Sequence, residues 1–371
     1  LKVARATPLR APVAPMAAAS AVARLSAACP CCSAALGGCL PRRPAVRQGD
    51  VASHYELGET LGSGAMGIVR KARPRRVLGA AAAVAVKSVR LLDSEGCGIL
   101  MPEELLQVQL EVEITLECRH PNVIRTLEAF MGAASLDIVM ELAAGGEVAA
   151  TFAEASTHSE RKAQAILLQV CSGLAYLHGR GIAHRDVKPE NVVYADERQE
   201  LVKLVDFGFA SRGMEPCGGE PLLEAKRRTL VGTAPFMAPE LFQPMDGCRL
   251  RVGDRCVAYG TAVDMWAVGV FAYLVLFGAL PFAPRGRFLA DFQEGVQQEW
   301  HFPEDLVEDF SAEALNFIEA CLDRSAAQRL TAADAVRHPW LSRRASASRL
   351  QHFEKWQRNV RRSLAERGAE R

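Results

Sequence analysis

Short apolar runs separated by polar turns fill the first part of the chain and predict β-strands. Runs at residues 84–86 and 136–140 each have the length of a strand and are bounded by polar or glycine-containing segments. Two further runs, 192–194 and 201–205, enclose a polar turn at 195–200. This spacing predicts a hairpin, which brings the residues before its first strand and after its second strand to the same end.

Helical periodicity dominates the rest of the pattern. It predicts helices over residues 102–118, 161–177 and 261–280. The apolar stripe of the second helix consists of Ile166, Val170, Leu174 and Leu177. The third helix belongs to an uncharged stretch that approaches the length needed to cross a bilayer. Because Gly278 and Pro281 would break a spanning helix, we expect a buried core helix and no transmembrane segment.

The two ends differ in composition from the patterned middle. Residues 1–49 contain seven Lys or Arg and no Asp or Glu, and they are rich in Ala and Pro. Such a segment cannot build a core, so we expect residues 1–50 to be a disordered basic tail. An organelle-targeting peptide starting at Met16 is the alternative, and the first residue is Leu rather than Met, as in a fragment. Residues 342–371 form a second basic tail.

Charge and cysteine content narrow the class of protein. The net charge is +1, so no global field attracts nucleic acid or membranes, and we expect neither as a partner. Most of the 11 cysteines stand alone in apolar segments, which indicates reduced core thiols in a cytoplasmic protein. The cluster at residues 29–32 with Cys39 has no His nearby and no standard zinc spacing, so we do not expect zinc there.

A compact set of polar residues lies at 184–191, directly before the predicted hairpin. Asp186 can accept the proton of an attacking hydroxyl, and Lys188 can lie against a transferred phosphoryl group. Asn191 and Asp206 flank the hairpin and offer oxygen ligands of the kind that Mg²⁺ prefers. Because the hairpin would bring these two residues together, the sequence predicts a magnesium-dependent phosphoryl-transfer site.

A glycine-rich stretch precedes the strand at 84–86. Residues 61–70 carry three glycines in G-x-G-x-x-G spacing, and Lys87 ends the next apolar strand. Glycines allow a backbone to lie close over phosphates because they have no Cβ. Lys87 would place a positive charge against the α and β phosphates. This pairing of loop and lysine resembles the ATP-binding loop of protein kinases, and the resemblance implies that ATP is bound by Leu61, Gly62, Ser63, Gly64, Gly67, Val69, Ala85 and Lys87.

In their order and spacing, these motifs resemble those of eukaryotic Ser/Thr protein kinases, and the ending at residues 337–341 resembles the calcium/calmodulin-dependent group. The resemblance covers residues 55–341. It implies an α+β, two-lobed fold, with a small antiparallel β lobe and one main helix at about 55–140 and a larger, mainly helical lobe at about 145–341. It also implies a monomeric enzyme that transfers the γ-phosphoryl group of ATP, with Mg²⁺, to Ser or Thr hydroxyls of protein substrates.

The resemblance implies an ion pair between the small-lobe helix and the strand lysine. Glu111 has the spacing of the family Glu that pairs with Lys87, and Glu113 should face elsewhere on the helix. Thr115 takes a position where the family usually has a large apolar residue, and we expect this departure to weaken the active arrangement.

The resemblance also implies an adenine and ribose site. Met140 would border adenine, and backbone groups of Glu141 and Ala143 would bond its edge. Glu147 would meet the ribose or, together with Glu190, an Arg before the phosphoacceptor. The nucleotide-facing set in this part of the chain is Met140, Glu141, Ala143, Glu147 and Val193.

Three further residues have structural roles by resemblance. Asp264 would anchor the backbone of the catalytic loop, and Arg329 would form an ion pair with Glu240. Lys188 and the Pro and Glu that follow it differ from the pattern with Arg and Ala found in tyrosine-specific members of the family, so the resemblance implies Ser or Thr as the phosphate acceptor.

Regulation is predicted at two places. Thr229 is the predicted activation-loop phosphosite, whose phosphate would pair with Arg185, although a plain loop Thr is the alternative. Thr233 resembles the family Thr that contacts the catalytic Asp and Lys.

Residues 349–364 have the pattern of a basic amphipathic helix that would dock on calmodulin or on the kinase's own lobe. Ser346 follows two arginines and is a predicted autophosphorylation site.

Two other classes of protein compete with the enzyme. A pseudokinase or scaffold would bind partners without chemistry, and only Met66 and Thr115 support it, since every catalytic side chain is present. A calmodulin-binding module would act mainly through residues 349–364. Phosphate transfer separates the first alternative from the enzyme, and peptide binding to calmodulin tests the second.

Overall fold

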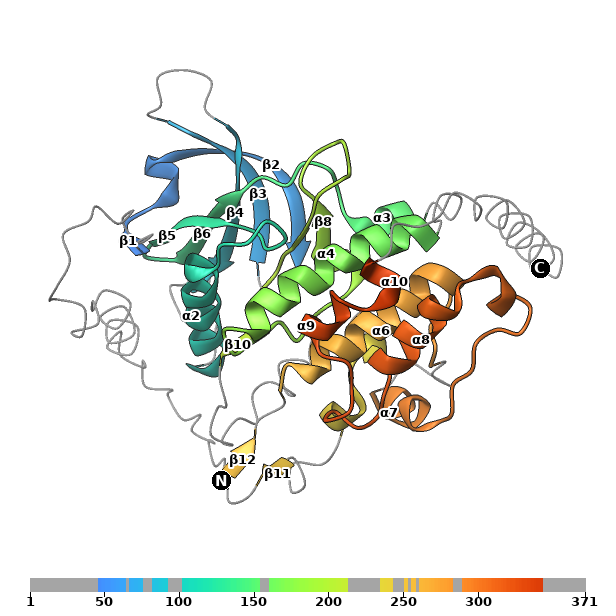
Figure 1. Ribbon diagram of the computed structural model, residues 1–371. Coiled ribbons are helices and arrows are strands. Elements are labelled where there is room, and N and C mark those ends of the chain that lie inside the picture. The colour runs from blue at the N-terminus through green and yellow to red at the C-terminus, as the bar shows by residue number, and fades with distance from the viewer. Residues whose placement is uncertain are drawn as a thin grey trace, which may run out of the picture.

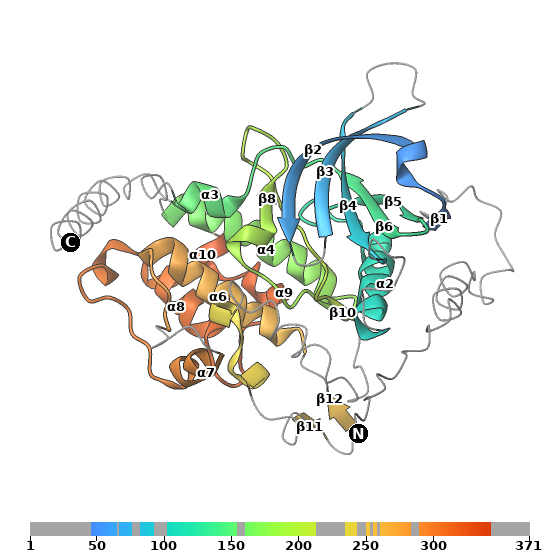
Figure 2. The ribbon, with the colours of Figure 1, turned by 180° about the vertical axis from the view of Figure 1, so that it is seen from behind.

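A computed structural model shows two lobes, a small one built on a β-sheet and a larger one built mainly of helices (Figure 1). Figure 2 shows the same two lobes from behind. This arrangement confirms the predicted α+β, two-lobed fold. The structure describes residues 46–64, 67–75, 82–92, 102–153, 160–212, 234–242, 250–252, 255–257, 260–282 and 289–342.

The small lobe is a six-stranded sheet in the order β1-β5-β6-β4-β3-β2. Neighbouring strands are antiparallel, except that β1 pairs in parallel with β5. The helix α2 (Pro102–Glu117) packs on one face of this sheet and lies within the helix predicted over 102–118. The strands are β1 (Val46–Gln48), β2 (Tyr55–Gly64), β3 (Gly67–Pro74), β4 (Val84–Arg90), β5 (Thr126–Met131) and β6 (Ser135–Glu141).

Part of the predicted N-terminal tail has regular structure. Residues 1–50 were expected to be disordered, but residues 46–48 form β1, and the 3-10 helix η2 (Val51–Ser53) follows. The physical reason is the edge of the sheet, because β1 satisfies backbone groups of β5 that would otherwise face solvent. The predicted boundary of the tail is therefore wrong for residues 46–50.

In the large lobe, helices surround α6 (Ala262–Phe277), which is buried along nearly its whole length. It contacts α4 (Glu160–His178) and α8 (Ala312–Cys321), so the helices predicted over 161–177 and 261–280 are confirmed with small changes at their ends. Gly278 closes α6 with a φ of 69°, a left-handed conformation that glycine adopts without steric cost. No helix in the described part of the chain has both the length and the apolar character needed to cross a membrane.

The other helices of the large lobe within the described residues are short. They are α3 (Val148–Ala153), α7 (Leu289–Gln297), α9 (Ala332–Ala335), α10 (Pro339–Ser342), and the 3-10 helices η3 (Pro189–Asn191), η4 (Ala234–Phe236), η5 (Pro239–Phe242) and η7 (Val307–Asp309).

The described part of the chain also contains three pairs of short antiparallel strands. The predicted hairpin is present as β8 (Val192–Tyr194) and β9 (Val202–Leu204). The two predicted metal ligands, Asn191 and Asp206, lie at its open end, where the N–H of Val205 donates to the carbonyl of Asn191 at 3.0 Å. The other pairs are β7 (Ile182–Ala183) with β10 (Ser211–Arg212) and β11 (Leu250–Val252) with β12 (Arg255–Val257).

The helix α2 contributes side chains to the cores of both lobes. Val108 and Val112 pack in a cluster with the small-lobe sheet, whereas Ile114 and, directly after the helix, Cys118 pack in the large-lobe core. Burial of apolar surface on both sides fixes the helix between the lobes. Glu111, which lies next to Val112, is thereby held at the junction.

The predicted contact between Arg329 and Glu240 is present in the large lobe. Nη1 and Nη2 of Arg329 donate to the two carboxylate oxygens of Glu240 at 2.7 and 3.1 Å. Nη1 also donates to the carbonyl of Ala262, at the start of α6, at 2.9 Å. The Arg329 side chain is fully buried, so this bidentate pair supplies partners that a buried charge requires.

Candidate active site

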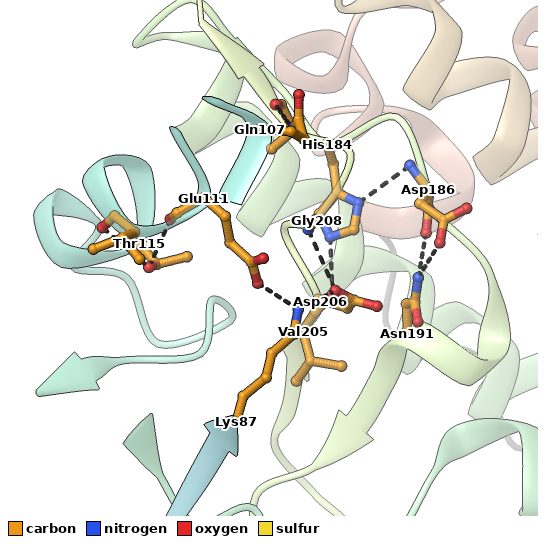
Figure 3. Close-up of polar contacts among 12 residues, drawn as sticks. Lys87, Gln107, Glu111, Thr115, His184, Asp186, Asn191, Val205, Asp206 and Gly208 are labelled. Atoms are coloured by element: carbon orange, nitrogen blue, oxygen red, sulfur yellow. Dashed lines mark hydrogen bonds and ion pairs between the residues drawn. The ribbon is translucent and has the colours of Figure 1, made fainter. Parts of the chain in front are cut away.

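Three charged side chains from different elements meet between the lobes (Figure 3). Lys87 extends from β4, and its Nζ lies 2.6 Å from Oε1 of Glu111 on α2. The same Nζ lies 2.9 Å from Oδ1 of Asp206, which follows β9. The structure thus contains the predicted pairing of Lys87 with Glu111, and Glu113 is exposed, as expected.

Burial and charge act in opposite directions on these groups. Burial would lower the pKa of Lys87, but Glu111 and Asp206 outweigh it and raise this pKa above the ordinary lysine value. Burial would raise the pKa of Asp206, but Lys87 and the N–H of Gly208 lower it to about 2. Burial raises the pKa of Glu111, and Lys87 offsets only part of this effect. At neutral pH the site therefore presents a lysine cation beside an aspartate anion.

The loop between β7 and β8 holds one carboxylate oxygen of Asp186 and leaves the other without a partner. Oδ2 accepts a hydrogen bond from Nδ2 of Asn191 at 2.7 Å and lies 3.0 Å from Nζ of Lys188. Asn191 Nδ2 also donates to the carbonyl of Asp186 at 2.8 Å. Oδ1 of Asp186 is buried and has no hydrogen-bond partner among the described residues. This oxygen is the atom that can accept the proton of a hydroxyl group.

The backbone of this loop is anchored on α6, as predicted for Asp264. Its Oδ1 accepts from the N–H of Arg185 at 2.7 Å, and its Oδ2 accepts from the N–H of His184 at 2.8 Å. Nε2 of His178 lies 2.8 Å from Oδ2. Burial would raise the pKa of Asp264, but His178 and His184 lower it. These contacts hold Arg185 in a left-handed conformation, with φ 64°, that would otherwise be strained.

Asp206 also has a left-handed backbone, with φ 59°. Asp adopts this region more readily than most residues. Gly208 donates its N–H to Oδ1 of Asp206 at 3.3 Å. The buried ring of Phe207 lies 4.8 Å from the ring of His184, whose Nε2 is 3.0 Å from the carbonyl of Val205. The catalytic loop and the segment after β9 therefore position each other.

Two further contacts fix α2 near Glu111. Gln107, one helical turn earlier, donates from Nε2 to the carbonyl of Ala210 at 3.0 Å. Thr115, one turn later, is buried and donates its hydroxyl to the carbonyl of Glu111 at 2.8 Å. The ion pair between Glu111 and Lys87 is closed with Thr115 in place. Sequence reasoning missed Gln107, although its spacing of four from Glu111 places both on one helix face.

The model of the protein kinase domain family matches residues 55–341. The chain belongs to the protein kinase domain family. This kinase is 32% identical over 295 residues to a probable myosin light chain kinase of Dictyostelium discoideum, an alignment that covers 78% of this chain and 66% of that one.

Two further comparisons extend the likeness. Death-associated protein kinase 2 of Mus musculus is 31% identical over 330 residues, covering 85% of this chain and 81% of that one. The twitchin kinase region from C. elegans superposes with a TM-score of 0.67 at 26% identity, covering 86% of this chain and 52% of that chain. The kinase thus spans about two thirds of the first relative and about half of the twitchin chain. These relatives place it among the Ser/Thr protein kinases related to the calcium/calmodulin-dependent group.

The glycine-rich hairpin of the kinase fits a phosphate cradle. A Cβ added at Gly62 or Gly64 would meet nothing within 4 Å, so the backbone there is open to a ligand. Gly67 has a φ of 140°, and a Cβ at this position would collide with the carbonyl oxygen of Ser88. The turn therefore requires glycine at position 67. The predicted ATP-binding residues Leu61, Ser63, Val69 and Ala85 lie on β2, β3 and β4 around this hairpin, and Met66 lies outside the described residues.

The donor set next to the cradle fits Mg²⁺. This ion is usually held through one or two carboxylates, phosphates and water. Asp206 is ionised and only its Oδ1 contacts Lys87 and Gly208. The amide nitrogen of Asn191 faces Asp186, an orientation that directs its oxygen away from that carboxylate. Asp206 and Asn191 would therefore supply the oxygen ligands for such an ion.

The connection between the lobes carries the predicted adenine-facing residues. Met140 pairs in register with Ala85 across β6 and β4. The N–H of Glu141 donates to the carbonyl of Arg125 at 3.0 Å, and its carboxylate lies 2.8 Å from Nζ of Lys203. Because the N–H of Glu141 already has a partner, the predicted hydrogen bond from this residue to the adenine edge is left to its carbonyl. Ala143 and Glu147 follow β6, and Val193 lies on β8. An isolated antiparallel β-bridge pairs Glu147 with Val193.

Several predicted residues lie outside the described part of the chain. They are Thr229, Thr233, the tail at 349–364 with Ser346, and the cysteine cluster at 29–32. Their predicted roles remain predictions. Arg185, the predicted partner of a phosphate on Thr229, is buried beside Asp186.

Replacing Asp264 by Asn is expected to lower both stability and turnover. An amide offers one oxygen, so the N–H of either His184 or Arg185 would face another donor, at a cost of about 1–3 kcal/mol for a buried unsatisfied group. A shift of the loop would also misplace Asp186 and lower kcat by about tenfold. Thermal unfolding and initial rates check this, and a variant with both quantities unchanged would contradict the anchoring role.

Proposed function

We propose that this kinase transfers the γ-phosphoryl group of ATP, bound with Mg²⁺, to Ser or Thr hydroxyls of protein substrates. One observation carries the proposal. The unpartnered Oδ1 of Asp186 lies in the same loop as Lys188 and Asn191, while Lys87 and Asp206 converge next to it. A proton acceptor, a phosphate-binding cation and two metal ligands are thus brought to one place.

Each side chain has a separate task in this reaction. Lys87, held by Glu111, would bind the α and β phosphates, and Asp206 with Asn191 would orient the triphosphate through the ion. Bound Mg²⁺ would neutralise charge on the phosphates. Oδ1 of Asp186 would accept the substrate hydroxyl proton, while Lys188 would lie against the transferred group.

The test of the function is transfer of radiolabel from ATP to a peptide library by the full chain. We expect label on Ser and Thr peptides, none on Tyr peptides, and none when EDTA removes Mg²⁺. Label on Tyr peptides would overturn the specificity, and no label on any peptide would overturn the activity.

We also infer a preference for Arg before the phosphoacceptor. The carboxylates of Glu147 and Glu190 are exposed near the catalytic loop, where they are free to meet a guanidinium group. Replacing Arg by Ala in the best peptide should raise KM in the wild type and much less in Glu147→Gln or Glu190→Gln. Asp305→Asn, an exposed acid before η7, is the control. Equal effects of the Arg change in all variants would contradict the inference.

Regulation is proposed at Thr229 and in the tail. A phosphate on Thr229 would add charge for Arg185, whose backbone is fixed by Asp264. The tail helix at 349–364 would bind calmodulin, as the name of the related calcium/calmodulin-dependent protein kinase type IV suggests, or dock on the kinase itself. Titrating a peptide of residues 346–366 with calcium-loaded calmodulin tests the first arrangement, and absence of saturable binding would contradict it.

A further inference from the structure

A segment that lies before the family match wraps around the edge of the small-lobe sheet. This N-terminal strap consists of residues 46–54, whereas the family match begins at Tyr55. Its first part, β1, is the edge strand of the sheet and pairs in parallel with β5, with Val46 opposite Ala129 and Gln48 opposite Met131. Figure 1 shows β1 beside β5, at the end of the sheet opposite β2.

One end of the strap packs on the face of the sheet that carries α2. Val46 is partly buried against the cluster that contains Val108 and Val112. Val112 is fully buried and immediately follows Glu111 in α2. The strap therefore adds apolar contact to the region that determines how closely Glu111 approaches Lys87.

The other end of the strap packs on the opposite face. Val51 is buried in a second cluster with Phe130 of β5, while Ala129 and Met131 on the same strand belong to the cluster of α2. Successive residues of a strand point to opposite faces, so the strap crosses from one face to the other around β5. The strap thus clamps β5 between two apolar contacts.

Polar contacts lock the strap along its length. Arg47 lies 2.8 Å from Oε2 of Glu128, whose Oε1 accepts from the hydroxyl of Tyr55 at 2.6 Å. The N–H of Gly49 donates to the carbonyl of Met131 at 3.0 Å. Nε of Arg75 donates to the carbonyl of Ala52 at 2.8 Å. These bonds fix both Val46 and Val51 relative to the sheet.

We propose that the strap is a positioning element for phosphoryl transfer, with Val46 seating α2 so that Glu111 holds Lys87. The inference rests on the proposed function, because it assigns a task in the same reaction to residues outside the family match. Val46 touches neither nucleotide nor substrate, so it acts through α2. The contact of Val51 on the opposite face would stabilise the lobe without this effect.

The test compares variants of the full chain at the two ends of the strap. Val46→Asp places a charge in the α2 cluster, Val46→Ala is a milder change that keeps the fold, and Val46→Ile is the conservative rescue. Val51→Ala removes two methyl groups from the opposite face, and Gln48→Ala changes an exposed residue of β1. Hydrogen exchange of residues 102–117 and kinetics for ATP are measured well below the unfolding temperature.

We expect both Val46→Asp and Val46→Ala to speed exchange in residues 102–117, and Val46→Asp to lower kcat/KM for ATP by about fivefold to tenfold. Val46→Ile, which keeps a branched apolar side chain, should have the exchange rate and the kcat/KM of the wild type. Val51→Ala should lower the unfolding temperature while leaving exchange in α2 unchanged, and Gln48→Ala should change nothing.

Two outcomes would overturn the inference. One is unchanged exchange in α2 for both Val46→Asp and Val46→Ala. The other is an equal rise for Val51→Ala, which would indicate only general destabilisation. The exchange measurement needs no catalysis. If the wild-type chain transferred no phosphate, the proposed function would fail, and exchange would still decide whether Val46 seats α2.

Discussion

Replacing Asp206 by Asn should lower phosphate transfer by about a thousandfold, the scale of losing a preorganised charge at a reacting phosphate. The pKa of Asp206 is held at about 2, so the wild-type carboxylate is fully ionised at neutral pH. An amide of the same shape has no charge for Mg²⁺ and cannot offset the charge of Lys87 2.9 Å away. Initial rates with radiolabelled ATP and a Ser peptide, at several Mg²⁺ concentrations, measure the loss.

The control for this variant is Asp305→Asn, which makes the same chemical change at an exposed site. Its rate should equal that of the wild type. Asp206→Asn should remain folded, because Glu111 still pairs with Lys87 at 2.6 Å. Equal phosphate transfer by Asp206→Asn and the wild type would contradict the role of Asp206 as a Mg²⁺ ligand. It would also favour a scaffold over an enzyme.

Replacing Asp186 by Asn should lower kcat by about 10²–10⁴-fold, the usual contribution of a positioned general base. The variant keeps the shape of the side chain but loses the buried, unpartnered Oδ1 as a proton acceptor. If the amide nitrogen instead took the place of Oδ2, it would put a donor next to Nδ2 of Asn191 and Nζ of Lys188, and the remaining amide oxygen would be a far weaker proton acceptor than a carboxylate. Single-turnover rates with a Ser peptide measure the effect.

The affinity for ATP separates the role of Asp186 from that of Asp206. Asp186 does not contact Lys87, so the affinity of Asp186→Asn for Mg-ATP should stay within about twofold of the wild type, whereas Asp206→Asn should bind Mg-ATP more weakly. A large loss of Mg-ATP affinity in Asp186→Asn, with the rate of bound substrate unchanged, would contradict a role in proton transfer.

Local motifs made much of the site predictable before any coordinates. The spacing of Asp186 and Asn191 and the hairpin that follows them depend on neighbouring residues, so periodicity and turn chemistry suffice. The pairing of Glu111 with Lys87 came from family resemblance, and the structure contains this contact. Helix bounds differed from expectation by only one or a few residues, as in α4 and α6, because the apolar stripes extend along most of each helix.

Contacts between elements that are distant along the chain could not be predicted from the sequence. His178 pairs with Asp264 because α4 and α6 lie side by side, and no spacing along the chain encodes that packing. The strand β1 was assigned to a disordered tail, since three residues after a basic, Ala-rich segment carry no strand pattern. Its order comes from the free edge of β5, a property of the assembled sheet.

A crystal structure of the chain with Mg²⁺ and a non-hydrolysable ATP analogue would test whether Lys87, Asp206 and Asp186 serve one nucleotide. We expect Nζ of Lys87 within about 3 Å of an α- or β-phosphate oxygen, and an oxygen of Asp206 about 2.1 Å from the ion. The γ-phosphate should lie beside Oδ1 of Asp186. A nucleotide whose phosphates reach Lys87 but not Asp206, or neither, would contradict the proposed site.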